Sequence, residues 1–372
     1  MTDAPLLKDS FGPTVPIRIA EMVAAVAPDF DSTGFCAATL DGYDDLELMA
    51  RSRKIADELA VYLPSEPAID VLHRSLPSES EAAEWTGIAG FILMPHGIYV
   101  SRHGLGCFEE SMQLQYEITK RFTSEFSIRA FIAGEYERTM ERLARWAHDP
   151  NEHVRRLVSE GTRSRLPWAA RLPMFQSDPH PVVELLELLK DDPSGYVRRS
   201  VANNLNDIAK DNPDVTIGVA KDWYSDDASP ERKTLVRRGL RTLIKQGDPR
   251  ALAVLGYAET SAIKLSDFTA TPEEPMIGES VRVAVVATNT TDKGVRLLID
   301  FAIDFVKANG TTSRKVFKGG EFELGPQASE SIAKTISVRQ HTTRTHYPGV
   351  HDVHALVNGS TNPIGSFTLL PA

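Results

Sequence analysis

The chain has 372 residues, 25% of them charged and 42% hydrophobic, and its formal net charge is −10. This length fits about two domains, and the composition is that of a soluble globular protein. The negative balance argues against a nucleic-acid partner for the surface as a whole, but it leaves room for a local basic patch. No apolar run is long enough to span a bilayer, and the amino-terminal residues do not resemble a signal peptide. The two cysteines, Cys36 and Cys107, form no spacing motif, so we expect free thiols in a cytoplasmic monomer.

The part of the chain before Asp149 carries helical patterns only. Apolar residues recur there with a period of about 3.6, and no stretch alternates as a strand does. The predicted helices cover residues 16–27, 44–63, 67–76, 78–93, 111–120, 124–133 and 135–148.

A helix that carries Val-Arg-Arg then occurs three times, each time shortly after a proline. The three arginine pairs are Arg155-Arg156, Arg198-Arg199 and Arg237-Arg238. The step from Arg155 to Arg198 is 43 residues, and the step from Arg198 to Arg237 is 39. A period of about 40 residues with two helices per unit is typical of a HEAT-like α-solenoid, in which each unit buries its apolar face against its neighbours.

The first copy has a strongly polar side. We predict Asp149 as the N-cap of its helix and Pro150 as the first helical residue. The apolar residues fall on one side of this helix, and Arg156, Glu160 and Arg163 fall together on the other. A partner of the protein would be bound on this polar side.

Comparable polar residues lie on the two later copies. The second copy turns Arg199 and Asp207 outward, and the third presents Arg238, Arg241 and Lys245. Stacked units would place these residues side by side on one concave surface, as a basic stripe that suits a phosphate backbone. The alternative is that charges four residues apart on each helix only pair with one another on a solvated face.

After residue 262 the helical periodicity gives way to alternation. Val281, Val283 and Val285 alternate along the chain, and pairs such as Asn309-Gly310 mark turns. Some seven short strands in the last 110 residues predict an immunoglobulin-like β-sandwich. The predicted fold class is therefore multidomain, α then β. It comprises a HEAT-like α-solenoid over residues 1–262 and an immunoglobulin-like β-sandwich over residues 263–372.

Other catalytic motifs are weak or missing. No nucleophile elbow, phosphate-binding loop or CxxC motif is present. His341 with His346, and His351 with His354, resemble metal-ligand pairs. Residues three apart on a strand face opposite sides, so the second pair does not share a site, and we expect no metal.

Three segments of the helical part resemble one enzyme family. They are ITKRFTSEFSIRAFI (118–132), NEHVRRLVSEGTRSRLPWAARL (151–172) and YVRRSVANNLNDIAKDNPD (196–214). They are similar to the AlkC family of bacterial DNA alkylation repair glycosylases, HEAT-like repeat enzymes related to AlkD, some of which carry a carboxyl-terminal immunoglobulin-like domain. The resemblance implies excision of the cationic bases 3-methyladenine and 3-methylcytosine from double-stranded DNA, leaving an abasic site. It implies neither a metal nor another cofactor.

This reaction calls for an anionic group beside the sugar. A base alkylated at N3 is a cation and a good leaving group, so the enzyme has mainly to stabilise the oxocarbenium charge that develops on the sugar and to position a water. The carboxylate candidates are Glu160, Asp207 and Glu125. Trp168, at a Pro-Trp corner, can stack on the damaged nucleotide or contact the cationic sugar through its ring face, and its alternative role is packing between repeats.

Each carboxylate also has a structural alternative. Glu160 can pair with Arg156, and Glu125 with Arg129, because each pair is four residues apart. Asp207 can be a capping or surface acid. The resemblance also implies a grip on the DNA backbone, for which the candidates are Arg156, Arg163, Arg199, Arg238, Arg241 and Lys245.

The leading hypothesis is therefore a monofunctional DNA-3-alkylbase glycosylase. The alternatives are a non-catalytic scaffold that binds nucleic acid and a solenoid that binds proteins. Carboxylates inside a basic surface distinguish these functions. They help an enzyme that generates a cation, and they gain nothing for a protein that only binds phosphates.

Overall fold

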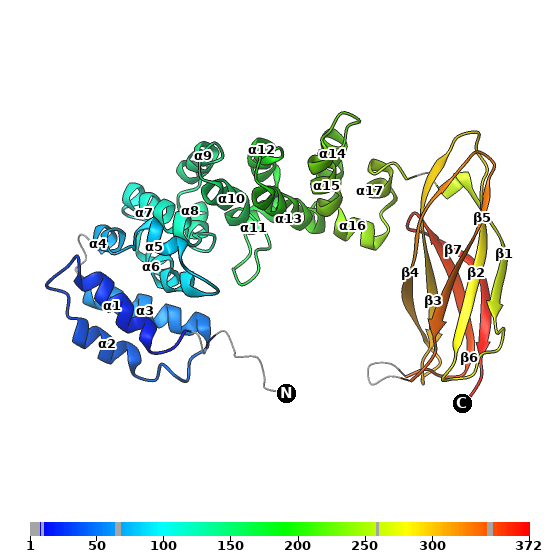
Figure 1. Ribbon diagram of the computed structural model, residues 1–372, viewed down its shortest axis with the longest axis horizontal. Coiled ribbons are helices and arrows are strands. Elements are labelled where there is room, and N and C mark those ends of the chain that lie inside the picture. Colours follow the sequence, from blue (N-terminus) through cyan, green and yellow to red (C-terminus); the bar gives the residue numbers. More distant parts are fainter. Residues whose placement is uncertain (1–7, 9–10, 64–67, 258–259, 341–344) are drawn as a thin grey trace. The chain divides into compact units, whose positions relative to one another are not determined.

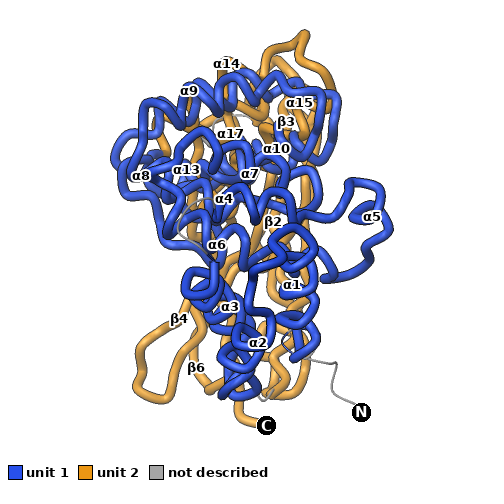
Figure 2. Tube along the Cα trace, turned by 90° about the vertical axis from the view of Figure 1, so that its left-hand side faces the viewer, with its two compact units in different colours: residues 1–212 blue, residues 213–372 orange. Residues whose placement is uncertain are grey.

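Helices make up the first part of the chain and β-strands the last part (Figure 1). The computed structural model describes residue 8 and residues 11–63, 68–257, 260–340 and 345–372. His341, named above together with His346, lies outside these residues. The chain folds into two compact units, Met1–Asn212 and Pro213–Ala372, which Figure 2 shows in different colours.

Among its described residues, unit 1 contains helices joined by turns and no β-strand. Its 3-10 helix η2 covers Ala89–Leu93. Its α-helices are α1 (Thr14–Ala24), α2 (Ser32–Leu40), α3 (Leu48–Tyr62), α4 (Ala68–Arg74), α5 (Glu79–Ala83), α6 (Met94–His103), α7 (Phe108–Arg121), α8 (Ile128–Gly134), α9 (Tyr136–Trp146), α10 (Glu152–Gly161), α11 (Pro173–Ser177), α12 (His180–Leu189) and α13 (Gly195–Asp211).

Two of these helices are not apparent from the sequence pattern. Helix α2 buries only Phe35 and Thr39, so no apolar stripe marks it. Helix α6 contains Pro95 and Gly97, which normally interrupt helices. Pro95 lies in its first turn, where the missing amide hydrogen would have no partner in any case.

The repeat helices α10 and α13 pack against each other, and α12 packs against both. In the first two copies, the first arginine folds back onto its own Asp-Pro turn. Arg155 donates from Nη1 to the carbonyls of Asp149 at 2.8 Å and Pro150 at 3.0 Å. Arg198 makes the equivalent bonds to the turn before α13. Arg155 also pairs with the carboxylate of Asp192 at 2.6 Å, which ties the first copy to the second.

The predicted start of α10 is wrong by two residues. Its N-cap is Asn151, whose side chain accepts a hydrogen bond from the backbone nitrogen of His153 at 2.8 Å. The carboxylate of Asp149 instead accepts from the nitrogen of Asn151 at 2.8 Å. The Asp-Pro pair thus forms a separate turn before the helix, and Asp192 and Ser194 repeat this arrangement before α13.

Unit 2 begins with helices and ends with strands. The third copy does not continue as one helix, because α15 ends at Gly239 and a second helix, α16, begins after Leu240. The helices of unit 2 are α14 (Pro213–Trp223), α15 (Pro230–Gly239), α16 (Arg241–Gln246), α17 (Pro249–Val254) and the 3-10 helix η3 (Thr260–Ala262). Its strands are β1 (Ile263–Thr271), β2 (Ser280–Asn289), β3 (Val295–Val306), β4 (Thr312–Leu324), β5 (Ser329–Ser337), β6 (Gly349–Val357) and β7 (Ser360–Leu369).

The strands form the predicted sandwich. One sheet has the order β1-β2-β5 and the other the order β4-β3-β6-β7, and all neighbouring strands are antiparallel. The expected alternation on β2 is confirmed, because Val281, Val283 and Val285 are fully buried. They share one apolar core with Phe301 of β3 and Val353 of β6. Alternate residues of each strand therefore fill the space between the sheets.

Unit 2 also joins its helices to its sandwich. Arg237 of α15 pairs with Glu321 of β4, which in turn pairs with Arg296 of β3 at 2.7 Å. These hydrogen bonds outweigh the effect of burial and lower the pKa of Glu321 to about 2. Across the described ranges, no helix of either unit combines the length and the apolar composition of a membrane span.

Candidate active site

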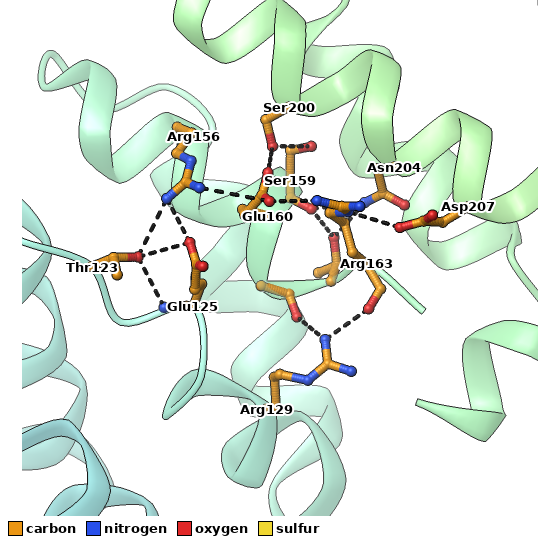
Figure 3. A network of polar contacts seen from close by, with 12 residues as sticks. Thr123, Glu125, Arg129, Arg156, Ser159, Glu160, Arg163, Ser200, Asn204 and Asp207 are labelled. Atoms are coloured by element: carbon orange, nitrogen blue, oxygen red, sulfur yellow. Dashed lines mark hydrogen bonds and ion pairs between the residues drawn. The ribbon is translucent and has the colours of Figure 1, made fainter. Parts of the chain in front are cut away.

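The candidate site forms at the carboxyl end of α10, where Glu160 is buried (Figure 3). Its Oε1 accepts a hydrogen bond from Nη1 of Arg163 at 2.6 Å and lies 3.6 Å from Nη2 of Arg156. Its Oε2 accepts a hydrogen bond from the hydroxyl of Ser200 on α13. Glu160 is only 6% exposed. Two repeats therefore fix one carboxylate in a defined orientation.

Arg163 connects Glu160 to a second buried carboxylate. Its Nε donates to Oδ2 of Asp207 at 2.8 Å, and Lys210 donates to Oδ1 of Asp207 at 2.8 Å. Burial opposes the charge of Arg163, but the two carboxylates raise its pKa above the ordinary value. The expectation that Asp207 points outward is wrong. It is 1% exposed, because Arg163 from the neighbouring repeat reaches over it and pairs with it.

Glu125 approaches the same site from the turn between α7 and α8 (Figure 3). Its Oε2 lies 2.6 Å from Nη1 of Arg156 and accepts a hydrogen bond from the hydroxyl of Thr123 at 3.1 Å. Glu125 thus pairs with an arginine of another repeat rather than with the arginine four residues later. Arg156 bridges Glu125 and Glu160, and its guanidinium lies 5.2 Å from the ring centre of Tyr196.

Neutral hydrogen bonds hold the last turn of α10 against α13. The side-chain amide of Asn204 donates to the carbonyl of Ser159 at 2.8 Å and to the hydroxyl of Thr162 at 3.1 Å. The hydroxyl of Thr162 donates to the carbonyl of Val158 at 2.8 Å. These bonds satisfy carbonyls that an α-helix leaves without partners at its carboxyl end. They also fix the turn that carries Glu160.

Trp168 lies on the segment between α10 and α11. It is 65% exposed, and its φ of 66° is a left-handed conformation that is uncommon for any residue with a side chain. Leu166 and Leu172 on either side are buried and anchor the segment. The ring is therefore held at the surface, which contradicts the alternative that it packs between repeats.

A pocket of about 420 Å³ opens beside Glu160. This volume lies within the range of about 300–1,000 Å³ that is usual for small-molecule sites. Glu125, Glu160 and Trp168 line the pocket, whereas Asp207 lies behind Arg163 and does not. The structure thus brings three of the four predicted catalytic residues to one pocket.

Four further aromatic residues line this pocket, and none of them is among the site residues predicted from the sequence. They are Phe91, Phe122, Phe126 and Tyr196. Phe122 and Phe126 belong to the segment 118–132, which carries the family resemblance. Tyr196 precedes the Val-Arg-Arg of α13, as His153 does in α10. Aromatic residues at helical spacing occupy core positions as often as they line pockets. The sequence pattern therefore does not show that these four residues line a pocket.

The basic residues predicted to grip DNA fall into two groups. Arg156 and Arg163 are engaged by carboxylates at the pocket. The others lie on the surface. The exposed members are Arg199 on α13, Arg238 on α15, and Arg241 and Lys245 on α16.

The histidines of the sandwich have structural partners. Nδ1 of His351 accepts a hydrogen bond from the backbone nitrogen of Val306 at 3.2 Å, and burial lowers the pKa of His351. Nε2 of His354 lies 3.0 Å from Asp304. In the part of the chain that the structure describes, no group of three His, Cys, Asp or Glu residues could hold a metal ion.

Comparison with known proteins extends over nearly the whole chain. A family model described as "Uncharacterised protein YhaZ, C-terminal Ig-like domain" matches residues 264–371. The uncharacterized protein YhaZ of Bacillus subtilis strain 168 is 37% identical over 356 residues, which are 95% of this chain and 96% of that protein. A solved structure, Pseudomonas fluorescens alkylpurine DNA glycosylase AlkC bound to DNA containing an abasic site analog, is 36% identical. It covers 98% of this chain and 99% of its own, with a TM-score of 0.76. The chain therefore belongs to the AlkC family of bacterial DNA alkylation repair glycosylases.

Proposed function

We propose that this protein is a DNA glycosylase that excises cationic N3-alkylated bases, 3-methyladenine and 3-methylcytosine, from double-stranded DNA. The observation that carries the proposal is one pocket lined by two carboxylates and an exposed tryptophan. The kinship with an alkylpurine DNA glycosylase that binds abasic-site DNA supports the same reaction class. We assign this activity to residues 1–262 and an accessory role in holding DNA to residues 263–372.

The reaction requires charge stabilisation more than acid catalysis. When the bond between C1′ and the base nitrogen breaks, its electron pair moves to the alkylated base, which leaves as a neutral molecule. The sugar becomes an oxocarbenium ion, which a nearby carboxylate stabilises. Water then adds to C1′ and loses a proton, giving an abasic site. The leaving base needs no proton from the enzyme. Two carboxylates therefore suffice for the reaction, and no general acid is required.

The residues of the pocket divide these tasks. Glu160 and Glu125 face the reacting sugar and orient the water, and Trp168 contacts the cationic nucleotide through its ring face. Asp207 is a positioning residue in this scheme, because it reaches the pocket only through Arg163. The exposed cations outside the pocket hold the phosphates, and they are Arg199, Arg238, Arg241 and Lys245.

Incubation with defined duplexes tests the proposal. One duplex contains 3-methylcytosine, one contains 3-methyladenine, and a third contains uracil, an uncharged base that would have to leave as an anion because no positive charge assists its departure. We expect free base and an abasic site from the first two duplexes and none from the third. Binding of all three duplexes without release of any base would contradict the glycosylase and favour the non-catalytic scaffold.

A further inference from the structure

A buried arginine on α8 links the two parts of the candidate site. Arg129 is 6% exposed, and its guanidinium bonds are to main-chain carbonyls. Nη1 donates to the carbonyls of Gly161 at 3.0 Å and Arg163 at 2.7 Å, and Nη2 donates to that of Ala170 at 2.5 Å. Figure 3 shows Arg129 beside the carboxylate network. The carbonyls that accept these bonds lie on both sides of Trp168 in the sequence, so one guanidinium group joins the two ends of the segment 161–170.

The local packing makes this contact possible. Gly161 is the last residue of α10, and a Cβ there would lie 2.5 Å from Cγ2 of Ile128, the neighbour of Arg129. Glycine therefore lets α8 approach the end of α10 closely. A cation at this place also suits the negative end of the α10 dipole. Gly161 follows Glu160 directly, so the bond to its carbonyl acts on the turn that presents the carboxylate.

Burial of this arginine carries a free-energy cost. Burial, with the positive charge of Arg163 nearby, lowers the pKa of Arg129 to about 10, although the group stays charged at neutral pH. The segment 161–170 carries Trp168, whose ring is exposed and whose backbone has a left-handed conformation. Backbone strain of this kind persists only where the surrounding structure holds it. Arg129 supplies three of the bonds that do so.

We propose that Arg129 is a positioning residue for base excision, which holds the carboxylate of Glu160 and the ring of Trp168 in a fixed relation across the pocket. This inference rests on the proposed glycosylase function. A guanidinium can reach three carbonyls in one plane, whereas a lysine ammonium cannot reproduce that fork. Misplacement of a reacting group by about 1 Å can cost about 100-fold in rate.

The full-length chain offers a matched control. Arg51 on α3 is 5% exposed and likewise donates to main-chain carbonyls, those of Leu46, Phe11 and Asp44 among them. It lines no part of the pocket beside Glu160. We compare Arg129→Ala and Arg129→Lys with Arg51→Ala and Arg51→Lys. The measurements are thermal unfolding, affinity for an abasic-site duplex, and the single-turnover rate of 3-methylcytosine release.

We expect replacement of either arginine to lower the unfolding temperature. Only the Arg129 variants should lose base excision. Arg129→Ala should slow release by about 100-fold while its affinity for abasic-site DNA changes less than about threefold. Arg129→Lys should remain folded and recover only part of the rate. Guanidinium chloride at non-denaturing concentration should partly restore the rate of base release by Arg129→Ala and leave the rate of Arg51→Ala unchanged. Equal rate losses in the Arg129 and Arg51 variants would overturn the positioning role, while failure of the unmodified protein to release any base would overturn the proposed function itself.

Discussion

At the scale of single residues, the charge of Glu160 is the feature on which the proposed chemistry depends. We predict that Glu160→Gln slows base release by about 100- to 1,000-fold, the usual cost of removing one electrostatic group from an active site. The amide can still bond to Arg163 and Ser200, so the fold and the affinity for abasic-site DNA should remain. Single-turnover release and duplex binding measure the two effects.

Glu117→Gln is a suitable control for this variant. Glu117 on α7 also accepts ion pairs, from Lys120 at 3.3 Å and Arg121 at 2.6 Å, but it does not line the pocket. We expect its replacement to leave release unchanged. Full activity of Glu160→Gln would reduce Glu160 to an ion-pair partner of the two arginines.

We predict that His96 makes the stability of unit 1 sensitive to mild acid. It is fully buried on α6, and burial lowers its pKa from 6.5 to about 4. Its Nδ1 has no hydrogen-bond partner among the described residues. The folded state therefore holds the neutral ring, and the stability present above pH 6.5 should fall by about 3 kcal/mol as the pH drops from 6.5 to 4.

Urea unfolding at several pH values checks this prediction. His96→Gln should flatten the loss of stability between pH 6.5 and 4, whereas His148→Gln, at an exposed position of the same unit, should not. Identical pH profiles for the two variants would show that another group controls the acid sensitivity.

At the scale of elements, Asp192 links the first Val-Arg-Arg copy to the second by pairing with Arg155. Its side chain, 3% exposed, accepts from Nε and Nη2 of Arg155 and from the backbone nitrogen of Ser194. We predict that Asp192→Ala destabilises unit 1 by about 3 kcal/mol, because it leaves a mostly buried arginine without its counter-charge. Asp178→Ala removes an exposed acid of the same unit and should change little. Chemical denaturation followed by circular dichroism distinguishes them.

The elements that could be predicted are those whose signal is local. The Val-Arg-Arg period identified α10 and α13, and the alternation on β2 identified the sandwich. The N-cap of α10 was misplaced because Asp149 and Asn151 both have side chains that can cap, and only the fold shows which one meets a free amide. The sequence pattern does not predict helix α2, because this helix has no apolar stripe.

Periodicity along one segment predicts that Arg156, Glu160 and Arg163 lie together, and the structure joins them by ion pairs although Arg163 lies just beyond the end of α10. Glu125 and Trp168, which are candidates through the family resemblance, line the same pocket as Glu160. Asp207 was placed on an outer surface because the arginine that covers it comes from 44 residues earlier in the chain. Arg129 could not be assigned its role, since its partners are main-chain carbonyls, which no side-chain pattern reveals.

At the scale of the whole molecule, the exposed cations Arg238 and Arg241 of unit 2 are proposed to contact DNA phosphates. We predict that the double variant Arg238→Ala/Arg241→Ala weakens binding of every duplex and lowers the slope of log affinity against log salt by about 2, roughly 0.9 for each phosphate that the variant no longer neutralises. Titrations between low and moderate salt measure this slope. Arg314→Ala, which removes an arginine that pairs with Asp304 at 2.7 Å in the same unit, should leave the slope unchanged.

The described partners of Glu160 are Arg156, Arg163 and Ser200, and all three belong to unit 1. The orientation of this carboxylate is therefore set when unit 1 folds, before any DNA is bound. Such preorganisation keeps the reorganisation energy of the chemical step small. Free energy gained from binding the phosphates is then not consumed in ordering the carboxylate.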